Sequence, residues 1–121
     1  MFRVIVAGGR DYCDYDKMKE SLDYFFQNKK PTSIVCGEAK GADKLGRKYA
    51  EENGIQVDSF PADWENEGKS AGYKRNERMS KNAEALVAYW DGESRGTANM
   101  IELMKNMGKP VKIVYYEGAV A

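Results

Sequence analysis

The sequence predicts a three-layer α/β fold with about five mostly parallel strands and helices on both faces. Short apolar segments alternate along the chain with longer segments whose apolar residues follow the helical period. The first apolar segment, residues 2–7, lacks a clean apolar–polar alternation, which is typical of a strand buried on both faces of a parallel sheet. Glycine-containing loops follow three of the expected strands, and such loops meet at the carboxyl edge of the sheet, where ligands bind.

Five elements are expected in the first half of the chain. A helix begins near Tyr15 because Met18, Leu22 and Phe25 fall on one helical face. Gly54 is a natural stop for the second helix. In order, the elements are a strand at 2–7, a helix at 15–28, a strand at 32–36, a helix at 42–53 and a strand at 55–60.

The second half of the chain continues the alternation after an irregular stretch. Met100, Ile101, Met104 and Met107 form the apolar stripe of a helix that stops at Gly108. In order, the segments are the irregular stretch at 61–71, a strongly charged helix at 72–82, a strand at 84–90, the helix ending before Gly108, a strand at 110–116 and a loose tail at 117–121.

The composition limits the classes of protein to which the chain can belong. Its 121 residues suffice for a single domain over residues 1–121, and a hydrophobic content of 42% suits a globular fold. Lys and Arg together number 19, as do Asp and Glu, which argues against a general nucleic-acid binder. Histidine is absent, which excludes Ser-His and Cys-His catalysis and the usual zinc sites. We expect neither a metal nor a cofactor.

Targeting and redox features predict a cytoplasmic protein without a membrane partner. The N-terminal segment is too short for a signal peptide, and no apolar run approaches membrane-spanning length. Cys13 and Cys36 have no metal-type spacing and are expected to be reduced thiols.

Residues 91–97 form the most informative loop, between the apolar strand and the amphipathic helix. The start of that helix presents free backbone N–H groups and the positive end of the helix dipole, which together favour an anion such as phosphate. Residues 8–10 and 37–43 also form glycine-containing loops after expected strands, each with a cationic side chain beside the glycines. The phosphate-binding residues expected in the three loops are Gly8, Gly9, Arg10, Gly37, Lys40, Gly41, Ser94, Arg95, Gly96 and Thr97.

The loops at 8–10 and 37–43 also have a simpler interpretation. Gly8 and Gly9 suit an ordinary tight turn with a surface Arg10, and neither a dinucleotide-binding fingerprint nor a Walker loop is present. Asp43 or Asp91 is expected to bind ribose hydroxyls, although Asp43 would also stabilise the first turn of a helix.

The segment from Lys69 to Lys81 is basic, with Glu77 as its single acid. Arg75 and Asn76, near the expected helix start, are predicted to close the site together with Lys69. The alternative for this segment is a solvated helix face, which is favoured for Lys74 and Lys81. Tyr12 and Trp64 lie in loops and are candidates for stacking on a base.

Five motifs together resemble the YspA/YpsA-related branch of the SLOG superfamily, which is named for the SMF/DprA proteins and the lonely-guy enzymes. They occupy residues 4–12, 37–43, 60–64, 68–79 and 90–97, and the resemblance extends over residues 2–116. It implies a Rossmann-like fold that binds nucleotides or nucleotide-derived ligands, in bacteria and phages. Some SLOG domains sense NAD-derived signals such as cyclic ADP-ribose forms, the lonely-guy relatives are phosphoribohydrolases, and the DprA relatives bind single-stranded DNA.

The resemblance to the phosphoribohydrolases is incomplete at one position. Arg75, Met79 and the pair Gly96-Thr97 match the motifs of these enzymes, but Met100 stands where they carry the catalytic Glu. Glu102 is two positions further on, which rotates it by about 200° around a helix, so it should face away. The carboxylates that remain as candidates for acid–base catalysis are Asp11, Glu38, Asp43, Asp91 and Glu93.

We therefore expect a Rossmann-like domain that binds a nucleotide-derived small molecule, of NAD or ADP-ribose type, as a sensor or sequestering protein. The alternatives are a nucleotide N-glycosidase and a single-stranded nucleic-acid binder acting through residues 69–81. Related proteins often form dimers, so the resemblance also implies a homo-oligomer.

Overall fold

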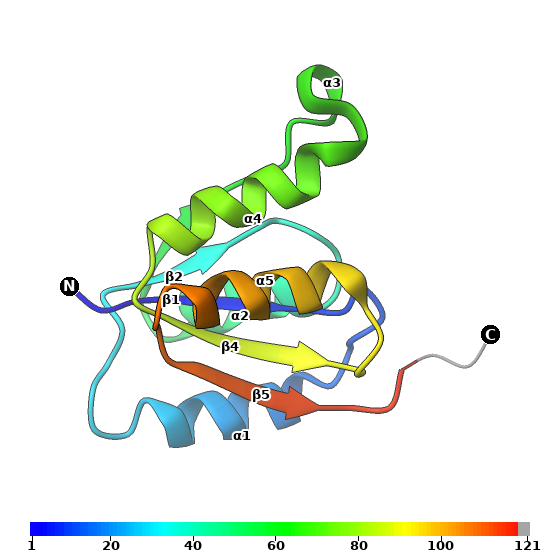
Figure 1. Ribbon diagram of the computed structural model, residues 1–121. Coiled ribbons are helices and arrows are strands. Elements are labelled where there is room, and N and C mark those ends of the chain that lie inside the picture. Colours follow the sequence, from blue (N-terminus) through cyan, green and yellow to red (C-terminus); the bar gives the residue numbers. More distant parts are fainter. Residues whose placement is uncertain (119–121) are drawn as a thin grey trace.

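The computed structural model describes residues 1–118, which contain a five-stranded sheet with parallel pairing between all neighbouring strands. The strand order is β3-β2-β1-β4-β5 (Figure 1). The strands are β1 Arg3–Gly8, β2 Ser33–Cys36, β3 Gln56–Ser59, β4 Ala85–Trp90 and β5 Val111–Tyr115. The predicted α/β fold class is confirmed.

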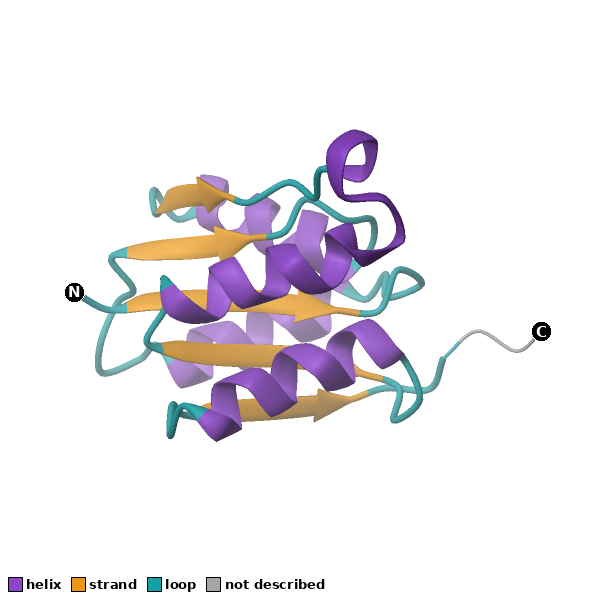
Figure 2. Cartoon of the chain, turned by 45° about the horizontal axis from the view of Figure 1, so that its top comes forward, coloured by secondary structure: helices purple, strands orange, loops and turns teal. Residues whose placement is uncertain are grey.

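Helices cover both faces of the sheet, as Figure 2 shows. Helices α1 (Tyr15–Phe25) and α2 (Ala42–Glu52) pack on one face, and α4 (Ala71–Lys81) and α5 (Arg95–Asn106) pack on the other. The short helix α3 (Trp64–Glu67) and the 3₁₀ turn η1 (Gly68–Ser70) connect β3 to α4. The result is a helix–sheet–helix sandwich with right-handed parallel crossovers expected for this topology.

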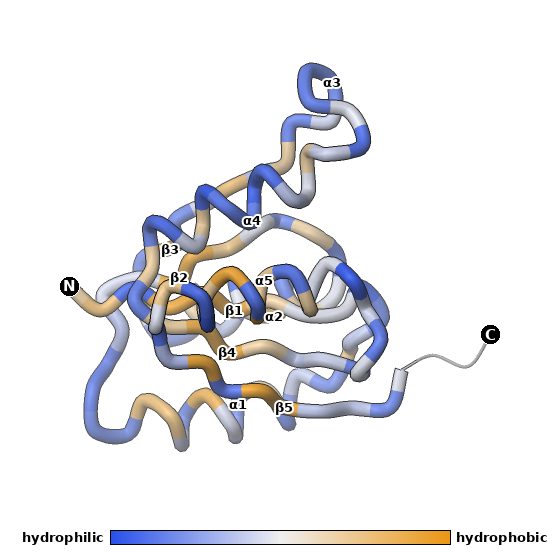
Figure 3. The backbone as a smooth tube through the Cα atoms, viewed as in Figure 1, coloured by the Kyte–Doolittle hydropathy of each residue, from blue (hydrophilic) through white to orange (hydrophobic). Residues whose placement is uncertain are grey.

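The central strand β1 explains why the sequence lacks alternation there. Val4 and Val6 belong to the core beneath α1 and α2, whereas Ile5 and Ala7 belong to the core beneath α4 and α5. Successive side chains of a strand point to opposite faces, so a strand between two helical layers needs apolar residues at every position. Figure 3 shows the hydrophobic residues concentrated along the central strands, while α3 and α4 are largely hydrophilic.

Several element boundaries differ from the sequence-based expectation. Helix α1 ends at Phe25 rather than at residue 28, and the Phe26 N–H donates to Leu22 O at 2.9 Å as the helix terminates. The irregular stretch 61–71 contains α3, which begins after Asp63 because its carboxylate accepts from Asn66 N at 3.2 Å. Of the tail expected to be loose, residues 119–121 lie outside the described part of the chain.

The order of the strands fixes where a ligand can bind. β2 and β3 extend the sheet on one side of β1, and β4 and β5 extend it on the other, so the chain order reverses between β1 and β4. The connections after these two strands lead to helices on opposite faces, which opens a crevice at their carboxyl ends. Within residues 1–118, no helix has the length and apolar character needed to cross a bilayer.

Candidate functional site

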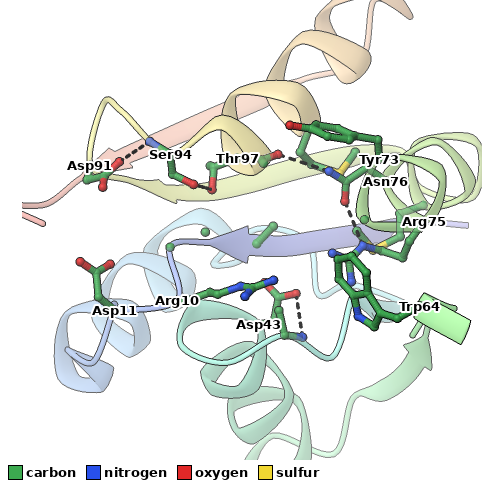
Figure 4. Close-up of a pocket in the computed structure, with 18 of the residues that line it drawn as sticks. Arg10, Asp11, Asp43, Trp64, Tyr73, Arg75, Asn76, Asp91, Ser94 and Thr97 are labelled. Atoms are coloured by element: carbon green, nitrogen blue, oxygen red, sulfur yellow. Dashed lines mark hydrogen bonds between the residues drawn. The ribbon is translucent and has the colours of Figure 1, made fainter. Parts of the chain in front are cut away.

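A cavity of about 500 Å³ lies at the carboxyl ends of the strands, within the size range of small-molecule sites. Figure 4 shows that its walls come from the loops after β1, β2 and β4 and from the α3–α4 segment. The sequence-predicted residues that line it are Gly8, Gly9, Arg10, Asp43, Trp64, Lys69, Arg75, Asn76, Asp91, Ser94, Gly96 and Thr97. Residues that are distant in sequence therefore meet around one space.

Five residues predicted for the site are not part of the cavity lining. Tyr12 is 3% exposed, and its ring packs against those of Tyr89 and Tyr116, so it belongs to the core rather than to a base-binding wall. Lys40 and Arg95 are exposed to solvent near the rim loops. Gly37 and Gly41 are the other two, and both matter through their backbone. Gly37 O accepts a hydrogen bond from Arg75, and Gly41 has a positive φ before α2.

Gly41 shows why the loop after β2 needs glycine. It precedes α2 with φ +77°, a conformation that other residues rarely adopt, and an added Cβ would lie 2.3 Å from Gly9 O. The next residue, Ala42, donates its N–H to Gly9 O at 3.2 Å. The loops after β1 and β2 are thereby fastened to each other beside the cavity.

The start of α5 forms an open corner of the cavity. Asp91 Oδ1 accepts from Glu93 N at 2.9 Å and from Ser94 N at 2.8 Å, which shapes the turn before the helix. The N–H groups of the first helical turn have no carbonyl partner within the helix and carry its positive dipole end. A Cβ added at Gly96 would meet no atom within 4 Å, so the space in front of this turn is open.

Two hydroxyl groups stand at the same corner. Ser94 Oγ and Thr97 Oγ1 lie 3.3 Å apart, and both residues line the cavity. Trp90 Nε1 donates to Ser94 O at 3.0 Å and so holds the turn in place from the side of β4. Backbone N–H groups and hydroxyls in this arrangement can donate several hydrogen bonds to one phosphate.

Arg75 and Asn76 tie α4 to the other walls of the cavity. Arg75 Nη1 donates to Gly37 O, and Arg75 Nε donates to Asn76 Oδ1 at 3.0 Å. Asn76 Nδ2 donates to Gly96 O at 3.2 Å and to Asn99 Oδ1 at 3.0 Å. The pair therefore joins the β2 loop to the first turns of α5, on opposite sides of the cavity.

Asp43 is a buried carboxylate in the cavity wall, with only 4% of its surface exposed. Its Oδ2 accepts from Ala39 N at 3.3 Å. Burial raises the pKa of Asp43 to about 6, because the ionised carboxylate loses hydration there, while the Arg75 charge and hydrogen bonds from Ala39 and Gly8 oppose the rise. A carboxyl group with this pKa can exist in either protonation state near neutral pH.

Sequence reasoning did not assign several lining residues to the site. Met100 lines the cavity with Ala7 and Met79, so the apolar stripe of α5 contributes to the floor of the cavity as well as to the core. Tyr73 also lines it. Asp11, one of the carboxylates expected as acid–base candidates, lines the cavity too and accepts a hydrogen bond from the Tyr116 hydroxyl. The exposed Glu102 is absent from the lining, which agrees with the helical geometry.

The remaining candidate carboxylates and lysines do not line the cavity. Glu38 pairs with Arg47 at 2.9 Å, and Glu93 is exposed outside the cavity lining. Lys74 and Lys81 are exposed on α4. In residues 1–118 we find no cluster of three or more His, Cys, Asp or Glu side chains suited to a metal ion.

Comparisons with known proteins agree with this architecture. The "Gene 61 protein" of Mycobacterium phage D29 is 31% identical over 118 residues, which cover 92% of this chain and 94% of the phage protein. The crystal structure of DNA processing protein A (DprA) from Streptococcus pneumoniae has a TM-score of 0.74 at 17% identity. The match covers 96% of this chain but only 50% of the DprA chain, so it shows a common fold over half of that protein. The model of the YspA, cpYpsA-related SLOG family matches residues 2–66, and the chain belongs to this family.

Proposed function

We propose that the protein binds a nucleotide-derived small molecule, of NAD or ADP-ribose type, in the cavity at the carboxyl edge of the sheet, and acts as a sensor or sequestering protein. The observation that carries the proposal is the open N-terminal turn of α5, which faces a cavity of about 500 Å³ with an aromatic side chain, Trp64, at its far end. Membership of the SLOG family supports a nucleotide-related ligand.

A phosphate group would occupy the corner at α5. The N–H groups of the first turn, with Ser94 and Thr97, would donate hydrogen bonds to it. Arg10 lines the opposite side of the same space and offers a guanidinium that can grip phosphate oxygens with two donors. Lys40 and Arg95, exposed outside the cavity lining, would attract an anionic ligand from solution.

Ribose hydroxyls would be recognised by the carboxylates of the cavity. Asp43 and Asp91 both line it, and each uses an oxygen to accept hydrogen bonds from the backbone. An ionised carboxylate has about four acceptor positions, so both retain capacity for a sugar hydroxyl. Arg75 and Asn76 would hold the surrounding walls in place.

Binding without turnover is favoured by the floor of the cavity. Met79 and Met100 supply thioether side chains, which have no group able to transfer a proton. Met100 occupies the helical position at which phosphoribohydrolases place their catalytic carboxylate, as the sequence resemblance implies. The ligand would therefore be retained intact.

A second candidate function, a nucleotide N-glycosidase, is supported by Asp43. This carboxyl group is buried in the cavity wall, and its pKa is raised to about 6. In such a reaction water oxygen would bond to the sugar C1′, the C1′–N bond would break, and the leaving base would take a proton from Asp43. Asp43 would then be restored by the proton released from the attacking water.

The experiment that tests the proposal is a thermal-shift screen with AMP, ADP-ribose, NAD and the cyclic ADP-ribose isomers. A ligand at about 100 times its dissociation constant adds roughly 2.7 kcal/mol of stability, which raises Tm by roughly 10 °C in a domain of this size. Mass spectrometry of the same samples distinguishes the two candidates, since retention returns the ligand intact and hydrolysis releases free base. If no compound raises Tm, the proposal fails, and titration with single-stranded DNA at two salt concentrations tests residues 69–81 instead.

A further inference from the structure

Two large aromatic side chains of the α3–α4 segment stand exposed at the cavity. Trp64 is 54% exposed and Tyr73 is 45% exposed, although each lines the cavity. Aromatic rings of this size usually bury most of their surface, and an exposed ring that lines a cavity is accessible to a ligand there. These rings therefore need an explanation beyond the packing of the fold.

The two tryptophans of the chain differ in how their polar ends are satisfied. Trp90 Nε1 donates to Ser94 O at 3.0 Å, and its ring packs against Tyr115 at 5.9 Å. Within residues 1–118, Trp64 Nε1 has no hydrogen-bond partner and its ring makes no ring–ring contact. Trp90 serves the fold, whereas the indole of Trp64 is left exposed at the cavity.

The two rings are held at the same end of the cavity. Figure 4 shows Trp64 and Tyr73 at one end and Asp11 and Asp91 at the other. Trp64 begins α3, which projects from the body of the molecule in Figure 1, whereas Tyr73 lies in the first turn of α4.

Neighbouring residues keep this end open and in position. A Cβ added at Gly72 would make an ordinary contact with Trp64 Cη2 at 3.6 Å, so the indole lies close to the first turn of α4. The ion pair between Arg78 and Glu67, with nitrogen and oxygen 3.2 Å apart, fastens α3 to α4.

We propose that Trp64 and Tyr73 form a subsite for the planar aromatic base of the ligand, with Trp64 supplying the principal stacking face. This inference rests on the proposed function, because it assumes that the phosphate lies at α5. It narrows the ligand class to nucleotides that retain their base and disfavours sugar phosphates. Stacking recognises the face of a ring rather than its hydrogen-bonding edge, so the subsite would accept more than one base.

The test compares AMP, ADP-ribose and ribose 5-phosphate by isothermal titration calorimetry on the full chain. We expect the two nucleotides to bind at least tenfold more tightly than ribose 5-phosphate. Trp64→Ala should weaken AMP binding by about 5- to 150-fold, which corresponds to the usual range for one stacked base, and Tyr73→Ala by a smaller factor. Neither substitution should change the affinity for ribose 5-phosphate.

Two further variants control this comparison. Tyr24→Ala removes another exposed aromatic ring, 67% exposed at the far end of α1, and should leave all three affinities unchanged. Trp64→Phe keeps a stacking face, so it should retain most of the AMP affinity while removing the contribution of Trp64 to the change in tryptophan fluorescence on binding. Unchanged Tm values in the absence of ligand would show that the fold is intact in each variant.

The outcomes separate this inference from the proposed function. If AMP binds equally to the wild type, Trp64→Ala and Tyr73→Ala, the aromatic subsite is refuted while the ligand site at α5 stands. Equal affinities for AMP and ribose 5-phosphate would refute it in the same way. If none of the three compounds binds the wild-type protein, both the subsite and the proposed function are refuted.

Discussion

Asp43 and Arg75 approach each other across Gly37, in the space that the missing side chain of this glycine leaves open. A Cβ added to Gly37 would lie 2.8 Å from Asp43 Oδ2 and 2.7 Å from Arg75 Nη1. The carboxylate comes from α2 and the guanidinium from α4, which cover opposite faces of the sheet. One wall of the cavity therefore joins the two helical layers through oppositely charged groups.

Replacing Gly37 should disturb this junction. We expect Gly37→Ala to lower the free energy of unfolding by about 1–3 kcal/mol, because the methyl group must displace the Arg75 guanidinium and the buried Asp43 carboxylate. Chemical denaturation measures the change. Gly72→Ala is the matched control, since its added methyl group would make an ordinary contact with Trp64 at 3.6 Å. Equal stability of the two variants would contradict the close approach of Asp43 and Arg75 to Gly37.

The burial of Asp43 predicts a pH dependence of stability. Its pKa rises from the ordinary 3.8 to about 6, so between these values the folded protein binds more protons than the unfolded chain. The stabilising contribution of the protonated carboxyl group is therefore present below about pH 4 and lost as pH rises through about 6. Since one pKa unit corresponds to about 1.4 kcal/mol, the loss is about 3 kcal/mol.

Asp43→Asn should remove this dependence, because the amide does not titrate. Chemical denaturation of both proteins from pH 4 to pH 8 measures this pH dependence. We expect the wild type to lose stability relative to Asp43→Asn across the interval. Parallel stability curves would mean that Asp43 keeps an ordinary pKa in the folded protein.

Asn76 should be important for both stability and binding. Asn76→Ala removes the acceptor of Arg75 Nε and the donor to Gly96 O, so we expect a loss of about 1–3 kcal/mol in the free energy of unfolding. The affinity for ADP-ribose should fall as well, because α4 and α5 lose a direct link beside the cavity. Asn106→Ala, at an exposed position in the last turn of α5, is the control and should change neither quantity.

The pair Arg3 and Glu84 should stabilise the start of the sheet in a pH-dependent manner. Arg3 Nη2 lies 2.7 Å from Glu84 Oε2, and hydrogen bonding to Arg3 lowers the pKa of Glu84 to about 2. Because the side chains are 28% and 37% exposed, solvent screening limits the effect of Glu84→Gln to about 1 kcal/mol at pH 7. The stability difference between the wild type and Glu84→Gln should decrease as pH falls through about 4.5 toward 2, where the carboxylate of the folded protein becomes protonated. A constant difference over this range would contradict the ion pair.

The fold was predictable because local patterns determine it. Val4, Ile5, Val6 and Ala7 are apolar at successive positions, and a strand covered on both faces buries all of them. The position of the cavity follows from the same pattern, since loops after parallel strands share one edge. The four-residue helix α3 could not be predicted in this way, because it is too short to show a helical period.

The roles of individual aromatic residues depended on contacts that a single sequence does not reveal. Tyr12 lies in a loop and was expected to face a base, but the adjacency of β1 and β4 places it against Tyr89 at 4.9 Å between ring centroids. Tyr73 lines the cavity from the first turn of α4, a placement that depends on tertiary packing and has no sequence signature. Arg95 occupies the first position of α5, and its exposed side chain lies outside the lining that its neighbours form.

The most direct test of ligand binding at α5 uses Gly96, where an added Cβ atom would meet no atom within 4 Å. An aspartate near a helix N-terminus stabilises the helix by about 0.3–1 kcal/mol, so Gly96→Asp should fold at least as well as the wild type. Its negative charge would nevertheless oppose a phosphate at the same corner, and we expect ADP-ribose affinity by calorimetry to fall at least tenfold, roughly 1.4 kcal/mol or more. Gly96→Ala, which adds volume without charge, should retain binding. If Gly96→Asp binds ADP-ribose as tightly as Gly96→Ala, or if the wild type does not bind it, no phosphate of this ligand is held at α5.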